Sequence, residues 1–195
     1  MEGSLPLVLA STSRYRAALL ARLQLACECA APGVQETHLA GEPPATRAAR
    51  LAEEKGKAVA ARMPARWVLG GDQVCALGSR ILDKPETLPN ARRQLCALSG
   101  QRAVFHTAIC LRHAASNRAL HAMDHTFVQF RTLSAAEIDR YLAAEDVLDC
   151  AGSFKCEGLG ISLFEAIETA DPTALVGLPL IATRRLLAAA GIAVP

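Results

Sequence analysis

Short apolar runs alternate along the chain with segments of helical periodicity, a pattern that predicts an α/β domain. The chain opens on an expected strand from Leu7 to Ala10. Further on, Leu51, Lys55 and Val59 recur at a spacing of four within an Ala-rich helix expected from about Arg47 to Arg62. This spacing places Lys55 on or beside the buried face of the helix. The usual explanation for a lysine there is that it lies at the edge of the apolar stripe and extends its ammonium group into water.

The stretch from Trp67 to Pro85 holds the most informative polar residues. A run rich in Val and Leu reads as a buried strand that stops at Gly70-Gly71, so Asp72 and Gln73 are expected where this strand reaches the surface. A polar turn then returns the chain, which would bring Lys84 toward Asp72 in a hairpin. An acid and a base that face one cleft can handle a metal and a phosphate. Taken alone, the segment is explained more simply as a surface hairpin with a solvated Asp and Lys.

The rest of the chain continues the alternation of strands and helices. The expected elements are a strand within Ala26 to Ala31, a helix from Pro89 to Leu98, strands from Arg102 to Arg112 and from Arg118 to Arg131, a helix from Ser134 to about Ala144, a strand from Ile161 to Ile167 and a last helix ending at Gly191. The two long strands are adjacent and predict an antiparallel hairpin. Ser134 and Glu137 have the spacing of a capping box. No repeat or interdomain linker is visible, so residues 1–195 are expected to form one domain.

The turn after the first strand is a candidate anion site. Ser11, Thr12 and Ser13 lead from the strand into a helical pattern, and Arg14 and Arg16 follow in its first turn. Hydroxyls, free backbone N–H groups and the helix dipole together attract an anion. Simple N-capping by a Ser explains the same residues without any ligand. The glycine-punctuated segment from Cys150 to Gly160 carries a Lys and a Glu and reads as a shaped loop.

Composition limits the partners of the domain. A hydrophobic content of 51% in 195 residues allows one good core, and a formal net charge of +2 with scattered basic residues argues against a nucleic-acid binder. No run approaches the roughly 18 apolar residues of a membrane span, and the start MEGSLPLVLAS lacks the basic leader of a signal peptide. We therefore expect a cytoplasmic protein without membrane contact.

The seven cysteines form no CxxC pair and have no matching His spacing for zinc. Buried free thiols are the favoured interpretation, ahead of disulfides or a metal site.

Several motifs, taken together, resemble the Maf family of nucleoside-triphosphate pyrophosphatases. They run in order from about Leu7 to Gly191 and read LASTSRYRAALL, EKGKA, GDQV, LDKP, LSG, FRTLSAAEIDRY, AGSFKCEGLGISLFE and LVGLPL. The combination of Asp72-Gln73 with GSFKCEGLG is similar to the branch of the family that acts on 7-methyl-GTP. The resemblance implies a long, strongly bent mixed sheet flanked by helices, as in the Maf/inosine-triphosphatase-like fold, with a cleft between the opening turn and the loop from Gly152 to Gly160.

The resemblance also implies roles for individual residues. Asp72 matches the family's proton acceptor, and Glu36 matches an acid that helps to hold a divalent cation, Mg²⁺ or Mn²⁺. A hard cation of this kind prefers oxygen ligands such as those of Glu36 and Asp72. Asp72 would either take the proton from the attacking water or orient this water through the metal. The positions that bind the phosphates match Ser11, Arg16, Lys55 and Lys84, and those that select the base match Tyr15, Gln73 and Glu157. The chain departs from the family at Arg14, where Pro is common, at Gln35, where an acid is common, and at Asp83, where Gly is usual.

The implied activity is hydrolysis of 7-methyl-GTP to 7-methyl-GMP and pyrophosphate, which would remove a modified nucleotide from the cell. Two alternatives stay open: a nucleotide-binding regulator of cell division that uses the same cleft without turnover, and a pyrophosphatase for other non-standard or pyrimidine nucleotides. Members of the family are often dimers, so a homodimer is a further expectation, although the residues themselves indicate no interface.

Overall fold

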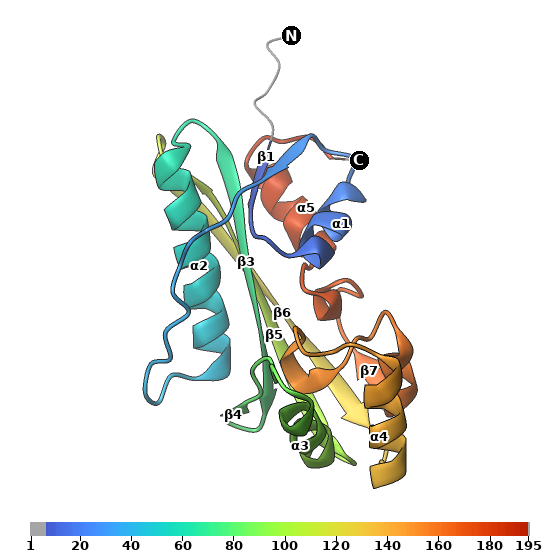
Figure 1. The fold of residues 1–195 in the computed structure, drawn as a ribbon. Coiled ribbons are helices and arrows are strands. Elements are labelled where there is room, and N and C mark those ends of the chain that lie inside the picture. Colours follow the sequence, from blue (N-terminus) through green and yellow to red (C-terminus); the bar gives the residue numbers. More distant parts are fainter. Residues whose placement is uncertain (1–6, 195) are drawn as a thin grey trace.

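The computed structural model describes residues 7–194, which form a mixed β-sheet with helices on both faces (Figure 1). The sheet has seven strands in the order β2-β1-β3-β5-β6-β7, with β4 paired to β3. The strands are β1 (Leu7–Ala10), β2 (Cys27–Cys29), β3 (Trp67–Leu77), β4 (Arg80–Ile81), β5 (Arg102–His113), β6 (Arg118–Phe130) and β7 (Phe164–Glu168). β1 pairs in parallel with β2 and β3, whereas β3, β5, β6 and β7 are antiparallel neighbours. The predicted α/β fold with a mixed sheet is confirmed.

The helices pack against different parts of the sheet. They are α1 (Arg14–Ala21), α2 (Pro44–Arg62), α3 (Leu88–Leu98), α4 (Ala135–Ala144) and α5 (Leu180–Ala189). In Figure 1, α2 covers one face of the long strands, α1 and α5 cover the other face near β1, and α3 and α4 pack at the far end near β7. None of the described helices is both long and apolar enough to cross a membrane.

β1 shows why the first apolar run folds as a central strand. Leu7 and Leu9 pack into the hydrophobic cluster beneath α1 and α5, while Val8 and Ala10 pack against α2 on the opposite face. All four residues are buried. A strand that is covered by helices on both faces must be apolar at successive positions, so no alternation is visible in its sequence.

The expectation that the central strand stops at Gly70-Gly71 is wrong. β3 continues to Leu77 and pairs with β5 along its length, from Trp67 opposite His113 to Ala76 opposite Val104. What ends at the glycines is the pairing of β1, whose last partner is Gly70. β4 pairs with the same edge of β3 only from Ala76 onward. The edge of β3 therefore opens between these two partners, and Asp72 and Gln73 lie within this interval.

Other predictions concern the second half of the chain. The hairpin of β5 and β6 is confirmed, and Ser134 and Glu137 form both hydrogen bonds of the capping box at α4. The strand expected from Ile161 begins only at Phe164, because residues Leu159–Leu163 form a 3₁₀ helix. Gly160 lies so close to Lys155 that a Cβ there would stand 2.4 Å from the Lys155 carbonyl oxygen, so the loop is still folded back on itself at this point.

All seven cysteines are free thiols, as expected, but most of them are not buried. Cys75 and Cys110 are buried, whereas Cys150 and Cys156 are partly exposed and Cys27, Cys29 and Cys96 are exposed. The exposed pair lies on β2, a strand at the edge of the sheet, which leaves its side chains uncovered. The expectation that the chain has no signal peptide concerns the segment MEGSLP, which lies outside the described residues.

Candidate active site

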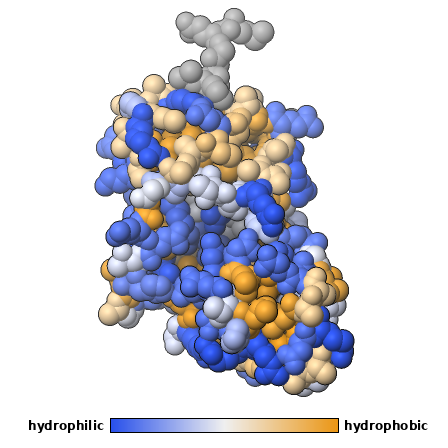
Figure 2. All heavy atoms as spheres, viewed as in Figure 1, coloured by the Kyte–Doolittle hydropathy of each residue, from blue (hydrophilic) through white to orange (hydrophobic). Residues whose placement is uncertain are grey.

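A cavity of about 830 Å³ opens beside β3, along the part of its edge that pairs with neither β1 nor β4. Figure 2 shows polar residues gathered around a hollow in this position. The lining comes from residues 10–16, from the loop that holds Glu36 and His38, from α2, from β3 and the segment after β4, and from residues 149–157. The cleft predicted between the opening turn and the glycine-punctuated loop is therefore present, with its loop side formed by residues 149–157.

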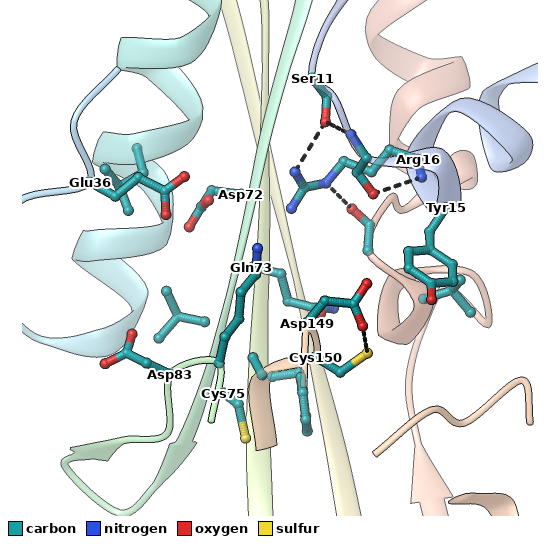
Figure 3. A pocket seen from close by; sticks show the side chains of 18 of the residues that line it. Ser11, Tyr15, Arg16, Glu36, Asp72, Gln73, Cys75, Asp83, Asp149 and Cys150 are labelled. Atoms are coloured by element: carbon teal, nitrogen blue, oxygen red, sulfur yellow. Dashed lines mark hydrogen bonds between the residues drawn. The ribbon is translucent and has the colours of Figure 1, made fainter. Parts of the chain in front are cut away.

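Lys55 lies at the centre of the charged cluster. Its Nζ atom lies 2.6 Å from Asp72 Oδ1 and 2.5 Å from Glu36 Oε1. Lys55 and Asp72 are 6% and 5% exposed, so the ion pair that they form is buried. Alternation along β3 places Asp72 on the face covered by α2, and Figure 3 shows Glu36 and Asp72 pointing toward each other. The structure therefore places Asp72 and Glu36 on the same side of the cleft, with the buried Lys55 between them.

Burial and charge act in opposite directions on the two carboxyl groups. Burial raises the pKa of Asp72 above its ordinary value, although Lys55 and Arg16 favour the ionised form. Burial also opposes ionisation of Glu36, but the hydrogen bond and charge of Lys55, with the charges of Lys84 and Arg16, outweigh it and lower the pKa of Glu36. A raised pKa makes the ionised carboxylate a stronger base than an ordinary Asp, which suits Asp72 to accept a proton.

The opening turn presents Ser11 and Arg16 to the cavity. Ser13 caps α1 by accepting from the Arg16 backbone N–H, so the simple capping interpretation is correct for this residue. Ser11 is buried, and its hydroxyl oxygen accepts from the Ser13 backbone N–H and from Arg16 Nη1 (Figure 3). Arg16 also donates through Nε to the Gly177 carbonyl, which fixes its guanidinium. Both residues are thus available to an anion in the cavity.

The charge of Arg16 is directed at the two acids across the cavity. Burial lowers the pKa of Arg16, and the negative charges of Asp72 and Glu36 act against this shift. Lys84, which follows β4, is exposed and lines the same cavity. Lys55, Arg16 and Lys84 therefore approach the acids from three different segments of the chain, and their predicted binding to phosphates stays a prediction.

Gln73 is held in place by the 3₁₀ segment Ala174–Val176. Its Nε2 donates to the carbonyl oxygens of Ala174 and Leu175 at 2.9 and 3.1 Å and to Thr107 Oγ1 at 3.0 Å. These acceptors fix which end of the amide is which, because an oxygen could not donate to two carbonyls. The sequence predicts a Gln73 that reads a polar edge of the base; the structure leaves its Oε1, an acceptor, for that role.

Tyr15 and Glu157 both line the cavity, Tyr15 from α1 and Glu157 from the loop after Cys150. The guanidinium of Arg14 lies over the Tyr15 ring, 4.9 Å from its centroid, and donates to the phenolic oxygen. Glu157 is exposed, and its carboxylate accepts a weak hydrogen bond from the Cys156 thiol. An aromatic ring and a carboxylate therefore border the same cavity, and their role in selecting the base stays a prediction.

The donor set fits a hard divalent cation that is shared with a substrate. Among residues 7–194, no group of three His, Cys, Asp or Glu side chains is arranged to hold a metal ion. Glu36 and Asp72 nevertheless converge on Lys55, whose positive charge compensates their negative charges in the structure. Mg²⁺ is typically held by one or two carboxylates together with substrate phosphates and water. Glu36 and Asp72 could thus hold such a cation when phosphates complete its shell.

Arg47 is a pocket residue that the sequence interpretation missed. It is 5% exposed, lines the cavity and forms an ion pair with Asp83. A signal for it was present, since Arg47 stands one turn before Leu51 in the same series that placed Lys55 on the buried face. Asp149, which also lines the cavity, had no comparable signal because it lies in an irregular loop.

The chain is similar in sequence to known proteins over nearly its whole length. The family profile of Maf-like proteins matches residues 6–190. Two proteins named 7-methyl-GTP pyrophosphatase, from Xanthomonas oryzae pv. oryzae (strain MAFF 311018) and Xanthomonas axonopodis pv. citri (strain 306), are 57% and 58% identical over 97% of this chain and 98% of theirs. A solved Ham1 protein of Staphylococcus aureus is 13% identical, with a TM-score of 0.47 over 65% of this chain and 72% of that one. Because the family profile and the two Xanthomonas relatives each cover nearly its whole length, the chain belongs to the Maf family.

Proposed function

We propose that this protein is a nucleoside-triphosphate pyrophosphatase that hydrolyses 7-methyl-GTP to 7-methyl-GMP and pyrophosphate. The observation that carries the proposal is the convergence of Lys55, Asp72 and Glu36 in one cavity with Arg16 and Lys84. Membership of the Maf family and the names of the close Xanthomonas relatives support the same activity.

The cationic residues match the charge of the substrate. A nucleoside triphosphate carries about four negative charges, which a site must balance with cations and hydrogen-bond donors. Arg16 and Lys84 supply two of these charges, and Ser11 and the first turn of α1 supply neutral donors. Lys55 is shared with the two acids and can turn to a phosphate when their charge is compensated in another way.

Asp72 is the residue assigned to the proton transfer. A water oxygen attacks the α-phosphorus, the bond from this phosphorus to the bridging oxygen breaks, and pyrophosphate leaves. Asp72 takes the proton that the water loses, and its raised pKa suits this role. The cations stabilise the negative charge that develops on the leaving pyrophosphate.

A divalent cation held by Glu36, Asp72 and the phosphates would add positive charge at the reacting phosphate. We include it in the proposal as Mg²⁺ or Mn²⁺. Its binding would also release Lys55 from the two carboxylates that hold its ammonium group in the structure, so that this group could bind a phosphate.

Pyrophosphate release tests the proposed function. The protein is incubated with 7-methyl-GTP, GTP, UTP and dTTP, each with Mg²⁺ and with chelator. The expected result is the highest kcat/KM for 7-methyl-GTP, with metal only. Faster turnover of pyrimidine nucleotides would assign the protein to another substrate class, and binding without turnover of any nucleotide would favour a regulatory role.

A further inference from the structure

Arg47 stands at the start of α2 in a place where an arginine is costly. The residue is 5% exposed, and its Nε atom has no hydrogen-bond partner among the described residues. Buried arginines normally have all their N–H groups paired, because an unpaired buried donor is destabilising. An arginine at this buried position therefore indicates a role for its two other nitrogens, Nη1 and Nη2, which do have partners.

The first partner of Arg47 is His38. Arg47 Nη1 lies 3.0 Å from His38 Nδ1, and Nη2 lies 3.3 Å from Nε2. A neutral imidazole has one acceptor nitrogen, so one of these contacts is a hydrogen bond. His38 stands two residues after Glu36 in the same loop, and it is largely exposed. The contact therefore fastens the loop that carries Glu36 to α2.

The second partner is Asp83. Arg47 Nη2 lies 3.1 Å from Asp83 Oδ1, and half of the Asp83 side chain is exposed. Asp83 directly precedes Lys84, so this ion pair fastens the segment that carries Lys84 to the same point of α2. The planar guanidinium can reach both partners at once, which a single ammonium group cannot do with the same geometry.

We propose that Arg47 is a positioning residue for the reaction: it holds the loop of Glu36 and the segment of Lys84 in register with Lys55 and Asp72. The inference rests on the proposed function. α2 then carries two buried cations two turns apart on one face, Arg47 and Lys55, of which Lys55 contacts the reacting groups and Arg47 holds the segments that bring the others. A displacement of about 1 Å in such groups can lower a rate by about 10²-fold.

The test compares Arg47→Met with Arg47→Lys. Met keeps an apolar stem without charge, whereas Lys keeps the charge but not the fork. Arg92→Met is the matched control, because Arg92 pairs with Asp139 between α3 and α4 and does not line the cavity. We expect Arg47→Met to lower kcat on the best nucleotide by about 10²-fold, Arg47→Lys to lower it less, and Arg92→Met to leave it within about twofold.

Hydrogen exchange gives a readout that does not depend on turnover. In Arg47→Met, backbone amides should exchange faster in residues 35–39 and 82–86, with no change in β5 and β6. If Arg47→Met does not fold, the same exchange measurement is made on Asp83→Asn and His38→Ala. These variants change the exposed partners of Arg47 and leave the buried arginine in place. Asp83→Asn should loosen residues 82–86 more than residues 35–39, and His38→Ala should do the reverse, because His38 Nε2 also lies 3.8 Å from Asp83 Oδ2.

The outcomes separate this inference from the proposed function. A wild-type protein that releases pyrophosphate from no nucleotide overturns the function, and the exchange pattern then decides whether Arg47 fastens both segments. A wild-type kcat in Arg47→Met, or exchange that is unchanged in both segments, overturns the positioning role. A loss spread evenly over β5 and β6 also overturns it, since Arg47 would then support the fold as a whole.

Discussion

Gly70 of β3 lies directly against Gly56 of α2. A Cβ atom built on Gly70 would stand 2.6 Å from the Gly56 nitrogen and 2.3 Å from the Ala52 carbonyl oxygen. The two backbones thus approach as closely as atoms permit, and this approach brings Lys55, the neighbour of Gly56, to Asp72. Gly70, the first glycine of the pair that resembled a strand end in the sequence, therefore allows α2 to pack close enough to bring Lys55 to Asp72.

Gly70→Ala should therefore be strongly destabilising. The added methyl group would meet backbone atoms that cannot move aside without separating α2 from β3. We expect a loss of about 3 kcal/mol in the free energy of unfolding, measured by urea denaturation. Gly71→Ala is the control, because its Cβ would make only ordinary contacts, the nearest at 3.6 Å. Equal losses for both variants would contradict this account.

Asp72→Asn should abolish turnover while the fold is retained. The amide keeps the shape of the carboxylate, but it cannot accept the proton and it does not balance the positive charge of Lys55. Loss of one such group costs several kcal/mol of barrier, a fall of about 10³-fold or more in kcat. Pyrophosphate release and circular dichroism are the measurements. A variant that keeps most of the wild-type rate would show that another group takes the proton.

The ionisation of Asp72 can be followed directly in metal-free protein by carboxyl ¹³C NMR. Burial raises its pKa, so the group should titrate above the ordinary value of about 4. Replacing Lys55 by Met removes a charge that favours the carboxylate, and the pKa should rise further. Proton uptake by Asp72 therefore begins at a higher pH in the variant as the pH falls. A lower pKa in Lys55→Met would contradict the assigned ion pair.

Chelation should abolish activity, and Mg²⁺ or Mn²⁺ should restore it. Glu36→Gln should raise the metal concentration needed for half-maximal rate, because one of the two converging carboxylates is lost. Glu36 is exposed and contributes little to the core, so the thermal stability of this variant should stay near that of the wild type. Full activity in chelator would remove the cation from the proposal.

The sequence predicts most elements of this fold because their signals are local. The strand at Leu7–Ala10, the capping box at Ser134 and the long hairpin each depend on residues close together in the chain. The end of β3 was predicted wrongly because glycine has two uses: it can end a strand, or it can admit a neighbouring backbone. Only the position of α2 decides between them.

The site shows the same division. Lys55 could be placed on a buried face from its spacing alone, whereas the resemblance was needed to connect it with Glu36, nineteen residues earlier in an irregular loop. Arg47 was open to the same argument as Lys55 and was overlooked. The tether of Gln73 to Ala174 could not be predicted, since it joins residues far apart in the sequence through main-chain carbonyls that carry no sequence signal.

Arg14 offers a way to change selectivity without touching the reacting groups. Its guanidinium lies 4.9 Å from the centroid of the Tyr15 ring, and its positive charge opposes a second cation there. 7-Methylguanine is cationic and guanine is neutral. Arg14→Ala should therefore raise the ratio of kcat/KM for 7-methyl-GTP to that for GTP, most clearly at low ionic strength. A ratio that is unchanged at every salt concentration would mean that the base lies away from Arg14.

Tyr15 and Glu157 should determine the base preference. Stacking of the cationic ring on Tyr15 contributes roughly 0.5 to 2 kcal/mol, so Tyr15→Ala should lower kcat/KM for 7-methyl-GTP by about 2- to 30-fold more than for GTP. Glu157 can accept from the N1–H and 2-amino groups together, so Glu157→Gln should weaken the preference for both guanine nucleotides over UTP. Steady-state kinetics on the three substrates separate these effects. Equal losses on 7-methyl-GTP and GTP in Tyr15→Ala would show that the ring only packs α1 and that the selecting residue lies elsewhere in the cavity.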